Sequence, residues 1–391
     1  MHAIAMTATD FPGATEAELA AGGALHTARE IAQQPRMLAR THALLAALQA
    51  QVEAFVAPVA SNPAARVILT GAGTSAYIGQ CLAPLLDRRL AARVDAVPTT
   101  DIVSVPQLHL DPAQPLLLVS FGRSGNSPES LAAVELAETL VADVRHLVVT
   151  CNPAGALGRV AVKQAFVLQL PEETHDAGFA MTSSFSCMLY ATLAALGGDD
   201  DLYARIGPLA ASMEQVIEGA HPALHALASR GFDRVAYLGS GVLQGLAREA
   251  ALKLGELSNG AVATCYDSTL GFRHGPKTFV NANTLVAVFV SNDPLTRRYD
   301  LDLVDELRAD GCAGQVLEIT AQPRAAHRDD SLAIPGMETA ADIDLLFPFV
   351  AAAQMYAFFA SRALGLSPDN PNPQGVVNRV VQGVRLYPLE A

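Results

Sequence analysis

Short runs of apolar residues recur along the chain, and the segments between them carry apolar residues at the three- and four-residue spacing of helices. Runs that are apolar throughout, rather than at every second position, are typical of parallel strands covered by helices on both faces. Segments 128–144 and 294–309 have such a helical pattern. The runs that we interpret as buried strands are 66–70, 116–119, 146–150, 234–238, 285–290 and 315–320.

The order of these elements occurs twice. In each half a strand leads into a glycine turn, at 71–75 and again at 239–243, and two further strands follow at similar distances. Each half, called here the first copy and the second copy, is therefore predicted to be a βαβαβ unit. The whole is predicted to be an α/β protein with two tandem doubly wound parallel sheets, flavodoxin- or Rossmann-like. We expect a helical arm at 1–47, domains at 48–208 and 209–366, and a C-terminal tail over the active site at 367–391.

The composition is that of a globular protein. Of the 391 residues, 51% are apolar and 17% charged, enough for large cores. The formal net charge of −13 and the acidic pI, about 5.2, argue against nucleic acid as a partner. No signal-like segment begins the chain, and Pro348 and Gln354 interrupt the apolar stretch 345–360. We expect a soluble cytoplasmic protein that does not bind membranes.

Metal and disulfide chemistry are not predicted. The five cysteines are scattered without C-x-x-C spacing, and an odd number of dispersed cysteines is typical of reduced thiols in a cytoplasm. We expect no metal site among them or among the ten histidines.

A turn rich in hydroxyl groups and glycine follows the apolar run 116–119. It includes Ser124, Gly125 and Ser127, and an amphipathic helix follows it. A helix N-terminus offers free N–H groups and a partial positive charge, so this turn suits a phosphate. An ordinary capped helix start is the alternative, because serine and asparagine are common capping residues.

The glycine turn of the first copy has the pattern G-x-G-x-x-A, close to a dinucleotide fingerprint, and Asp95 lies near where a ribose-binding acid would be expected. A nicotinamide cofactor is therefore one interpretation. Thr74 and Ser75, however, place two hydroxyls in the turn, and a second hydroxyl-rich turn follows the next major strand. This pair suits a phosphomonoester better than a pyrophosphate, and we favour a sugar-phosphate site.

The second copy lacks this pattern. Where the first copy has Ser-Gly-Asn-Ser at 124–127, the second has Ser-Asn-Asp-Pro at 291–294. Because the carboxylate of Asp293 would repel a phosphate, we expect one phosphate site per chain, in the first copy.

Two segments of the second copy carry candidate chemistry. In the helix that ends near residue 257, Glu249 and Lys253 are spaced as a surface ion pair, and Glu256 falls on the solvated face by periodicity. His274 stands beside Gly-Pro, where a histidine is commonly a turn residue. The buried stripe of the helix is predicted at 243, 246, 247, 250, 251, 254 and 257.

Together these motifs resemble the sugar isomerase (SIS) domain proteins. They resemble the isomerase half of glucosamine-6-phosphate synthase and, more closely, the AgaS group, whose members are named galactosamine-6-phosphate deaminase or tagatose-6-phosphate ketose/aldose isomerase. The resemblance runs from about residue 30 to the end of the chain. The segments that carry the closer resemblance are 98–101, 173–176, 178–184, 266–268 and 377–383.

The resemblance implies a role for each matching residue. Glu256 matches the carboxylate that moves a proton between sugar C2 and C1, and His274 matches the histidine that opens the sugar ring. That histidine reaches the site from the neighbouring subunit in the family, which implies a homodimer or a higher homo-oligomer with shared sites. The substrate- and phosphate-binding set is Gly73, Thr74, Ser75, Arg123, Ser124, Asn126, Ser127, His175, Thr182, Ser183 and Arg379.

The sequence departs from the synthase pattern in places. Gly122 stands where the synthase has a phosphate-binding serine, and we expect Arg123 to compensate. Arg379 stands where the synthase has a lysine that reacts with the carbonyl, and an arginine stays protonated and does not readily form a Schiff base. No glutamine amidotransferase domain precedes residue 66, so release of ammonia is the expected direction.

The predicted activity is deamination of galactosamine 6-phosphate to tagatose 6-phosphate, without metal or organic cofactor. The alternatives are aldose–ketose isomerisation of a sugar phosphate without an amine, deamination of glucosamine 6-phosphate, and a non-catalytic sugar-phosphate sensor. Sensors of this family usually add a basic DNA-binding region, whereas residues 1–60 carry few basic residues. The expected partner is a small sugar phosphate.

Overall fold

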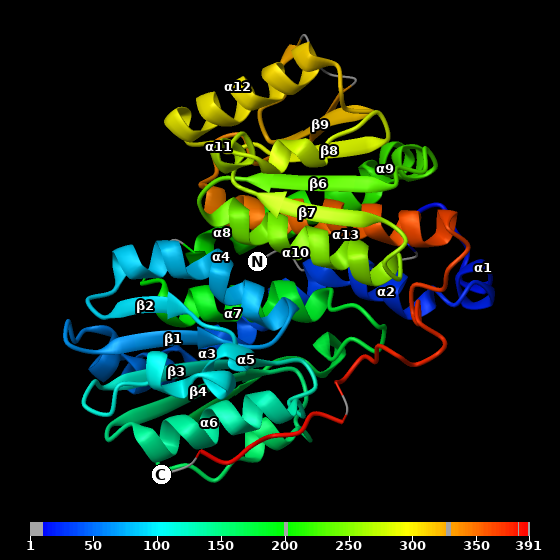
Figure 1. The fold of residues 1–391 in the computed structure, drawn as a ribbon. Coiled ribbons are helices and arrows are strands. Elements are labelled where there is room, and N and C mark those ends of the chain that lie inside the picture. The colour runs from blue at the N-terminus through cyan, green and yellow to red at the C-terminus, as the bar shows by residue number, and fades with distance from the viewer. Residues whose placement is uncertain (1–10, 199–201, 326–329, 382, 390–391) are drawn as a thin grey trace. The chain divides into compact units, whose positions relative to one another are not determined.

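The structure, a computed structural model, describes residues 11–198, 202–325, 330–381 and 383–389 (Figure 1). The chain forms two compact units. The first-copy unit comprises Met37–Asp176, Ser183–Ala204 and Gln374–Ala391, and the second-copy unit comprises Met1–Arg36, Ala177–Thr182 and Arg205–Pro373. These units are made of interleaved segments, whereas the limits expected after residues 47, 208 and 366 divide the chain into continuous pieces. Those limits remain a prediction.

The first-copy unit is built on a parallel sheet with strand order β2-β1-β3-β4-β5 (Figure 1). The strands are β1 (Arg66–Thr70), β2 (Arg93–Ala96), β3 (Leu116–Gly122), β4 (Val144–Thr150) and β5 (Ala165–Gln169). The helices are most of α3 (Gln34–Ala60), then α4 (Thr74–Arg89), α5 (Thr99–Ser104), α6 (Pro128–Leu140) and α7 (Ser183–Leu196), with short 3-10 turns η1 (Pro106–Leu108), η2 (Ala156–Arg159) and η3 (Glu172–Thr174).

Helices cover both faces of this sheet, which explains the unbroken apolar runs. Ile68 and Leu118 belong to a core cluster with Ala133 and Ala137 of α6. Leu69, whose side chain points to the opposite face because strand residues alternate, lies against Gly79 of α4. Every residue of β3 is buried, as expected for a central parallel strand.

The second-copy unit repeats the plan with the order β10-β9-β8-β6-β7, again all parallel (Figure 1). The strands are β6 (Arg234–Gly239), β7 (Ala263–Asp267), β8 (Thr284–Phe289), β9 (Gln315–Thr320) and β10 (Ser331–Ala333). The helices are α1 (Glu16–Ala21), α2 (Leu25–Ala32), most of α8 (Leu202–Gly219), α9 (His221–Ala228), α10 (Val242–Leu257), α11 (Thr269–Phe272), η4 (Pro276–Phe279), α12 (Pro294–Asp310) and α13 (Asp342–Ala363).

Helix α13 is the core helix of this unit and packs along α10 and α9. Its Phe349 stacks on Phe289 of β8, and Phe289 in turn stacks on Tyr237 of β6, with ring centroids 5.6 and 6.1 Å apart. By length and composition alone, α13 and α3 are apolar enough to cross a membrane. The apolar window of α13 is wholly buried, so this signal is weak evidence for a span.

The predicted α/β class with two tandem parallel sheets is confirmed. The duplication extends to backbone detail, because Gly73 (φ 55°, ψ −128°) and Gly241 (φ 58°, ψ −126°) adopt nearly the same conformation before α4 and α10. A positive φ of this kind favours glycine, since a side chain would be strained there.

Candidate active site

The first glycine turn leads directly into α4. The helix begins at Thr74 with Gly73 as its N-cap, and no side chain caps it. Gly71 is required by packing, because a Cβ atom there would lie 2.5 Å from that of Ser75. Thr74 and Ser75 are buried in the first turn of the helix. The predicted hydroxyls therefore lie at a helix N-terminus, where the partial positive charge of the helix suits an anion.

The second predicted turn leads into α6, whose N-cap, Ser127, also makes no capping bond. The Ser127 hydroxyl instead donates to Glu129 Oε2 at 2.7 Å. The Asn126 side chain is also engaged, because its Oδ1 accepts a bond from Ala156 N at 3.0 Å. Asn152 donates to the carbonyl of Ser124 at 2.7 Å. The loop after β4 thus holds this turn in shape, and Asn126 contributes to that support.

The missing serine at Gly122 has a steric explanation. A Cβ atom at this position would approach Leu157 Cδ2 to 2.9 Å and the Cα of Gly125 to 3.1 Å. The first contact is with the flexible end of the Leu157 side chain, and the second is tighter than nine in ten real Cβ contacts, so a serine would require Leu157 to move and the backbone at Gly125 to give way slightly. Gly122 and Gly125 therefore pack against each other, and Gly125 itself has a positive φ of 64°.

Three buried hydroxyls that the sequence analysis did not select lie near these turns. Thr70 and Ser120 are register partners on β1 and β3, at or near the carboxyl ends of these strands, and Thr99 begins α5. Within the described part of the chain, none of their side-chain oxygens has a hydrogen-bond partner. Buried hydroxyls usually find partners, so these three are candidates for polar contacts with a ligand or water.

Arg123 and Arg379 form a cluster with the loop before α7. Arg379 Nε donates to the carbonyl oxygen of Asp176 at 3.0 Å, and a second guanidinium nitrogen donates to the same oxygen. Arg123 Nη2 donates to the carbonyl oxygen of Arg379 at 2.9 Å. The pKa of His175 is lowered, first by burial and then by the positive charges of Arg379 and Arg123. The neutral form of the imidazole is therefore favoured beside these two guanidinium groups.

Ser183 lies at the N-terminus of α7, in contact with a carboxylate. Asp176 accepts hydrogen bonds from the Ser183 hydroxyl at 2.5 Å and from the backbone N–H and hydroxyl of Ser184 at 2.9 and 2.5 Å. This helix N-terminus is thus occupied by an acid of the same unit. Thr182 is buried and belongs to the second-copy unit.

In the second-copy unit the corresponding positions are occupied by carboxylates. Asp293 caps α12 through the N–H groups of Leu295 and Thr296. The buried Asp300 accepts bonds from Ser240 Oγ at 2.7 Å and Ser291 N at 3.0 Å. Burial raises the pKa of Asp300. These acids take up donors that would otherwise be available to an anion, which supports the expectation of a phosphate site in the first copy alone.

The prediction that Glu249 and Lys253 form their ion pair at the surface of α10 is wrong. Their side chains are 0% and 1% exposed. Lys253 Nζ lies 3.6 Å from Glu249 Oε1 and makes a second, closer ion pair with Glu256. The Glu256 side chain is 26% exposed, so it is neither buried nor fully solvated. Periodicity missed the burial because the helix packs against β6 and β7 on one side and α13 on another. The result is a lysine between two carboxylates.

His274 is exposed, in the turn between α11 and η4. The backbone N–H of His274 donates to the carbonyl oxygen of Gly271 at 2.9 Å. Ion pairs hold both sides of this turn: Arg273 contacts Asp302 at 2.7 Å, and Lys277 contacts Asp310 at 2.5 Å. The fixed turn presents the imidazole outward.

No metal-binding cluster of three or more His, Cys, Asp or Glu side chains occurs among the described residues. His221 and His225 do have the H-x-x-x-H spacing on α9, with ring centroids 6.1 Å apart. They lack a third ligand there, so the spacing alone carries no metal assignment.

Comparison with known proteins identifies the family. Residues 62–196 match the model of the SIS domain. A Streptomyces coelicolor protein, provisionally named D-galactosamine-6-phosphate deaminase AgaS, is 48% identical over 94% of this chain and 96% of its own. An Escherichia coli protein named D-galactosamine-6-phosphate deaminase AgaS is 44% identical over 93% of this chain and 96% of its own.

A solved structure shares the fold over its whole length. Tagatose-6-phosphate ketose/aldose isomerase from Escherichia coli is 41% identical, with a TM-score of 0.87 over 98% of this chain and 100% of that chain. The resemblance found in the sequence motifs is thereby confirmed. The chain belongs to the SIS domain family, in the AgaS group.

Proposed function

We propose that the protein is an amino-sugar-6-phosphate deaminase that converts galactosamine 6-phosphate to tagatose 6-phosphate and ammonium. The relatives at 44–48% identity over nearly the whole chain bear this name, which supports the substrate class. The observation that carries the reaction type is the partly exposed carboxylate of Glu256 beside the buried ammonium of Lys253.

The roles of the first-copy residues follow from their chemistry. Thr74, Ser75, Ser124 and Ser127 offer hydroxyls, and α4 and α6 offer backbone N–H groups, to the 6-phosphate. Arg123 adds a guanidinium, which suits a phosphate because its planar donors match two oxygens. Gly73, Asn126, Ser183 and His175 shape this surface, and Thr182 remains a candidate for a contact with the sugar.

Proton transfer is assigned to two side chains. His274 passes a proton from O1 to O5 and opens the ring, since a neutral imidazole has one nitrogen that donates a proton and one that accepts it. Glu256 removes the proton from C2, which gives an enolamine, and returns a proton to C1, which gives a C2 imine. Water adds to the imine and ammonium leaves, so C2 becomes a ketone. Positioning and proton transfer suffice, and no step requires a metal or organic cofactor.

Arg379 does not form a covalent intermediate in this scheme. Its guanidinium remains protonated and binds the carbonyl of Asp176, so we assign it a positioning role. We further propose a homodimer, or a higher homo-oligomer, in which the exposed His274 serves the site of a neighbouring subunit. All five cysteines are free, which supports a cytoplasmic location.

The second candidate is aldose–ketose isomerisation, favoured by the name of the Escherichia coli structure. Product analysis by NMR separates the two. The purified protein is incubated with galactosamine 6-phosphate and, separately, with tagatose 6-phosphate. A deaminase forms tagatose 6-phosphate and ammonium from the first substrate, whereas an isomerase leaves the amine in place and forms an aldose phosphate from the second.

A further inference from the structure

The C-terminal segment 374–381 and 383–389, called the strap, belongs to the first-copy unit and makes polar contacts at Arg379. The guanidinium of Arg379 binds the carbonyl of Asp176, and the carbonyl of Arg379 accepts a bond from Arg123. Around this point the strap is open to solvent: Val377 and Val381 are 55% and 53% exposed. Two arginines, Arg123 and Arg379, thus help to hold the strap to the unit.

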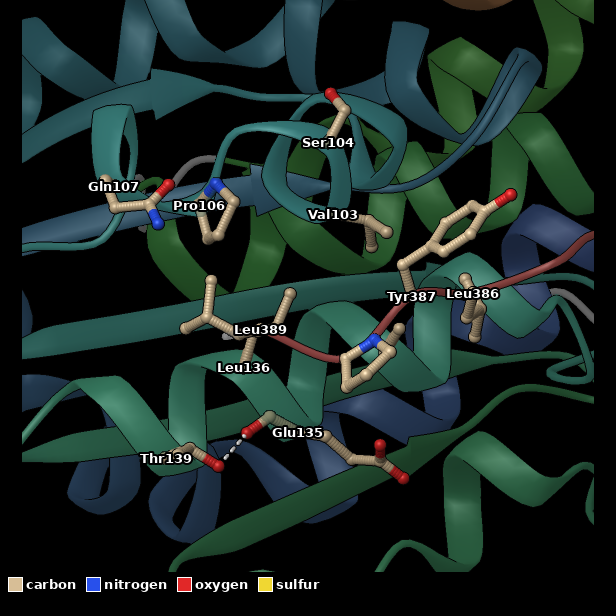
Figure 2. Close-up of a pocket in the computed structure, with 12 residues that line it drawn as sticks. Val103, Ser104, Pro106, Gln107, Glu135, Leu136, Thr139, Leu386, Tyr387 and Leu389 are labelled. Atoms are coloured by element: carbon tan, nitrogen blue, oxygen red, sulfur yellow. Dashed lines mark hydrogen bonds between the residues drawn. The ribbon is translucent and has the colours of Figure 1, made fainter. Parts of the chain in front are cut away.

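The end of the strap lies over a groove that it does not fill. Leu386, Tyr387, Pro388 and Leu389 line a cavity of about 560 Å³ together with residues of α5, η1 and α6 (Figure 2). Leu386 and Leu389 are still 40% and 41% exposed. An apolar end that covers an unfilled cavity gains less from burial than a packed core segment, so its attachment is weak.

Both walls of this groove belong to elements that carry the predicted phosphate turns. Helix α6, which supplies Glu135, Leu136 and Thr139, begins at the turn that ends with Ser127. Helix α5, which supplies Val103 and Ser104, packs against α6. Thr99, the first residue of α5, donates its backbone N–H to the carbonyl oxygen of Gly71, which lies in the glycine turn before α4. The groove and the phosphate turns therefore share their supporting helices.

We propose that the strap is a detachable clasp on the phosphate turns, in which Arg379 is a positioning residue for Arg123. This inference rests on the phosphate site of the proposed function. With the strap docked, the carbonyl of Arg379 fixes one donor of a guanidinium that has five. Arg123 then meets the phosphate without first losing side-chain freedom. With the strap detached, Arg123 loses this support and phosphate binds more weakly.

Coupling of this kind is reciprocal. If docking of the strap increases the affinity for phosphate, bound phosphate must favour the docked strap by the same factor. Trypsin reports the detached state directly, because cleavage after Arg379 needs its guanidinium in the protease and therefore free of Asp176. The probe is inorganic phosphate, and intact-mass spectrometry identifies the product that ends at Arg379.

The experiment compares the full-length protein with Leu386→Ala/Leu389→Ala, which weakens the strap end. The control is Val377→Ala/Val381→Ala, which removes apolar side-chain atoms from strap residues that do not line the groove. We expect saturating phosphate to slow cleavage of the wild type about fivefold. The groove variant should be cleaved faster and bind phosphate about tenfold more weakly. The control should match the wild type.

Two results overturn the inference in distinguishable ways. If calorimetry shows equal phosphate affinity in the wild type and groove variant, and phosphate leaves cleavage unchanged, the coupling is wrong while the phosphate site stands. If phosphate binds to neither protein, the phosphate site itself is wrong. The variant Arg379→Ala adds a third readout. Its KM should rise more than its kcat falls, and added guanidinium ion should lower that KM. Loss of a merely structural residue would not give this response to guanidinium.

Discussion

The ammonium group of Lys253 lies 3.6 Å from the carboxylate of Glu249, and neither side chain is exposed to solvent. Lys253 also pairs with Glu256, the partly exposed carboxylate to which we assign proton transfer. One buried cation therefore serves two acids, each about one turn away from it along α10. Burial removes the ammonium group of Lys253 from water, which costs free energy. The attraction of the two carboxylates compensates for part of this cost.

Removal of Lys253 alone should be severely destabilising, because the buried carboxylate of Glu249 would lose the ammonium group that lies 3.6 Å from it. We expect Lys253→Met to lower the free energy of unfolding by about 3–5 kcal/mol in urea titrations. The double variant Glu249→Leu/Lys253→Met removes both charges and should recover at least half of that loss. A double variant no more stable than the single one would contradict a buried pair.

Glu256 should be essential for turnover and dispensable for folding. We expect Glu256→Gln to reduce kcat by about 10²–10⁴-fold, the range typical of a general acid–base residue. The melting temperature should change little, since the side chain is partly exposed. Glu218→Gln, the same change at an exposed position of α8, serves as the control. Unchanged kcat in Glu256→Gln would rule out the assigned proton shuttle.

A serine at position 122 should weaken the protein rather than restore a phosphate ligand. The contacts of its Cβ with Leu157 and Gly125 lead us to expect Gly122→Ser to cost about 1–3 kcal/mol of unfolding free energy. It should also weaken phosphate binding, because the turn must move. Gly207→Ser is the matched control, since a Cβ at Gly207 meets nothing within 4 Å. Thermal unfolding of both variants tests this.

The buried His146 should make stability fall in mild acid. Its pKa is lowered, mainly by burial, although Glu138 at 3.1 Å opposes that shift. Below the ordinary histidine value of 6.5 the unfolded chain takes up a proton that the folded state resists, so stability declines as pH falls through the lowered pKa. Urea titrations at pH 7.5 and 5.5 measure this decline.

Replacement of His146 by glutamine removes the titrating group. The decline between the two pH values should then become smaller, with the partly exposed His109→Gln as control. An identical decline in the wild type and the His146 variant would show that another group is responsible. His175, whose pKa is also lowered by burial, is the first such candidate.

Much of the fold was predictable from local pattern. The apolar runs of β3 and β8 and the glycine turns before α4 and α10 are fixed by short-range requirements: burial on both faces and a positive φ. The burial of Glu249 and Lys253 was not predictable, because helical periodicity places them on a polar face. Only the packing of α10 against both the sheet and α13 encloses them.

The site was predictable in part for the same reason. Ser124 and Ser127 follow a strand and precede a helix, so sequence alone places them at a helix N-terminus. Sequence alone did not select the buried hydroxyls of Thr70 and Ser120, because lone polar residues at the end of apolar strands are usually satisfied by neighbours. The three-dimensional structure is needed to see that, among the residues it describes, no group bonds to these two hydroxyls, which the sheet register places side by side.

The most direct test of the account is ammonium release by the purified protein. Galactosamine 6-phosphate is supplied as substrate, with glucosamine 6-phosphate and the N-acetylated sugar phosphates alongside. The account predicts ammonium from galactosamine 6-phosphate in one-to-one ratio with tagatose 6-phosphate, faster than from the gluco epimer and absent in Glu256→Gln. No ammonium from any of these compounds would contradict the proposed deaminase.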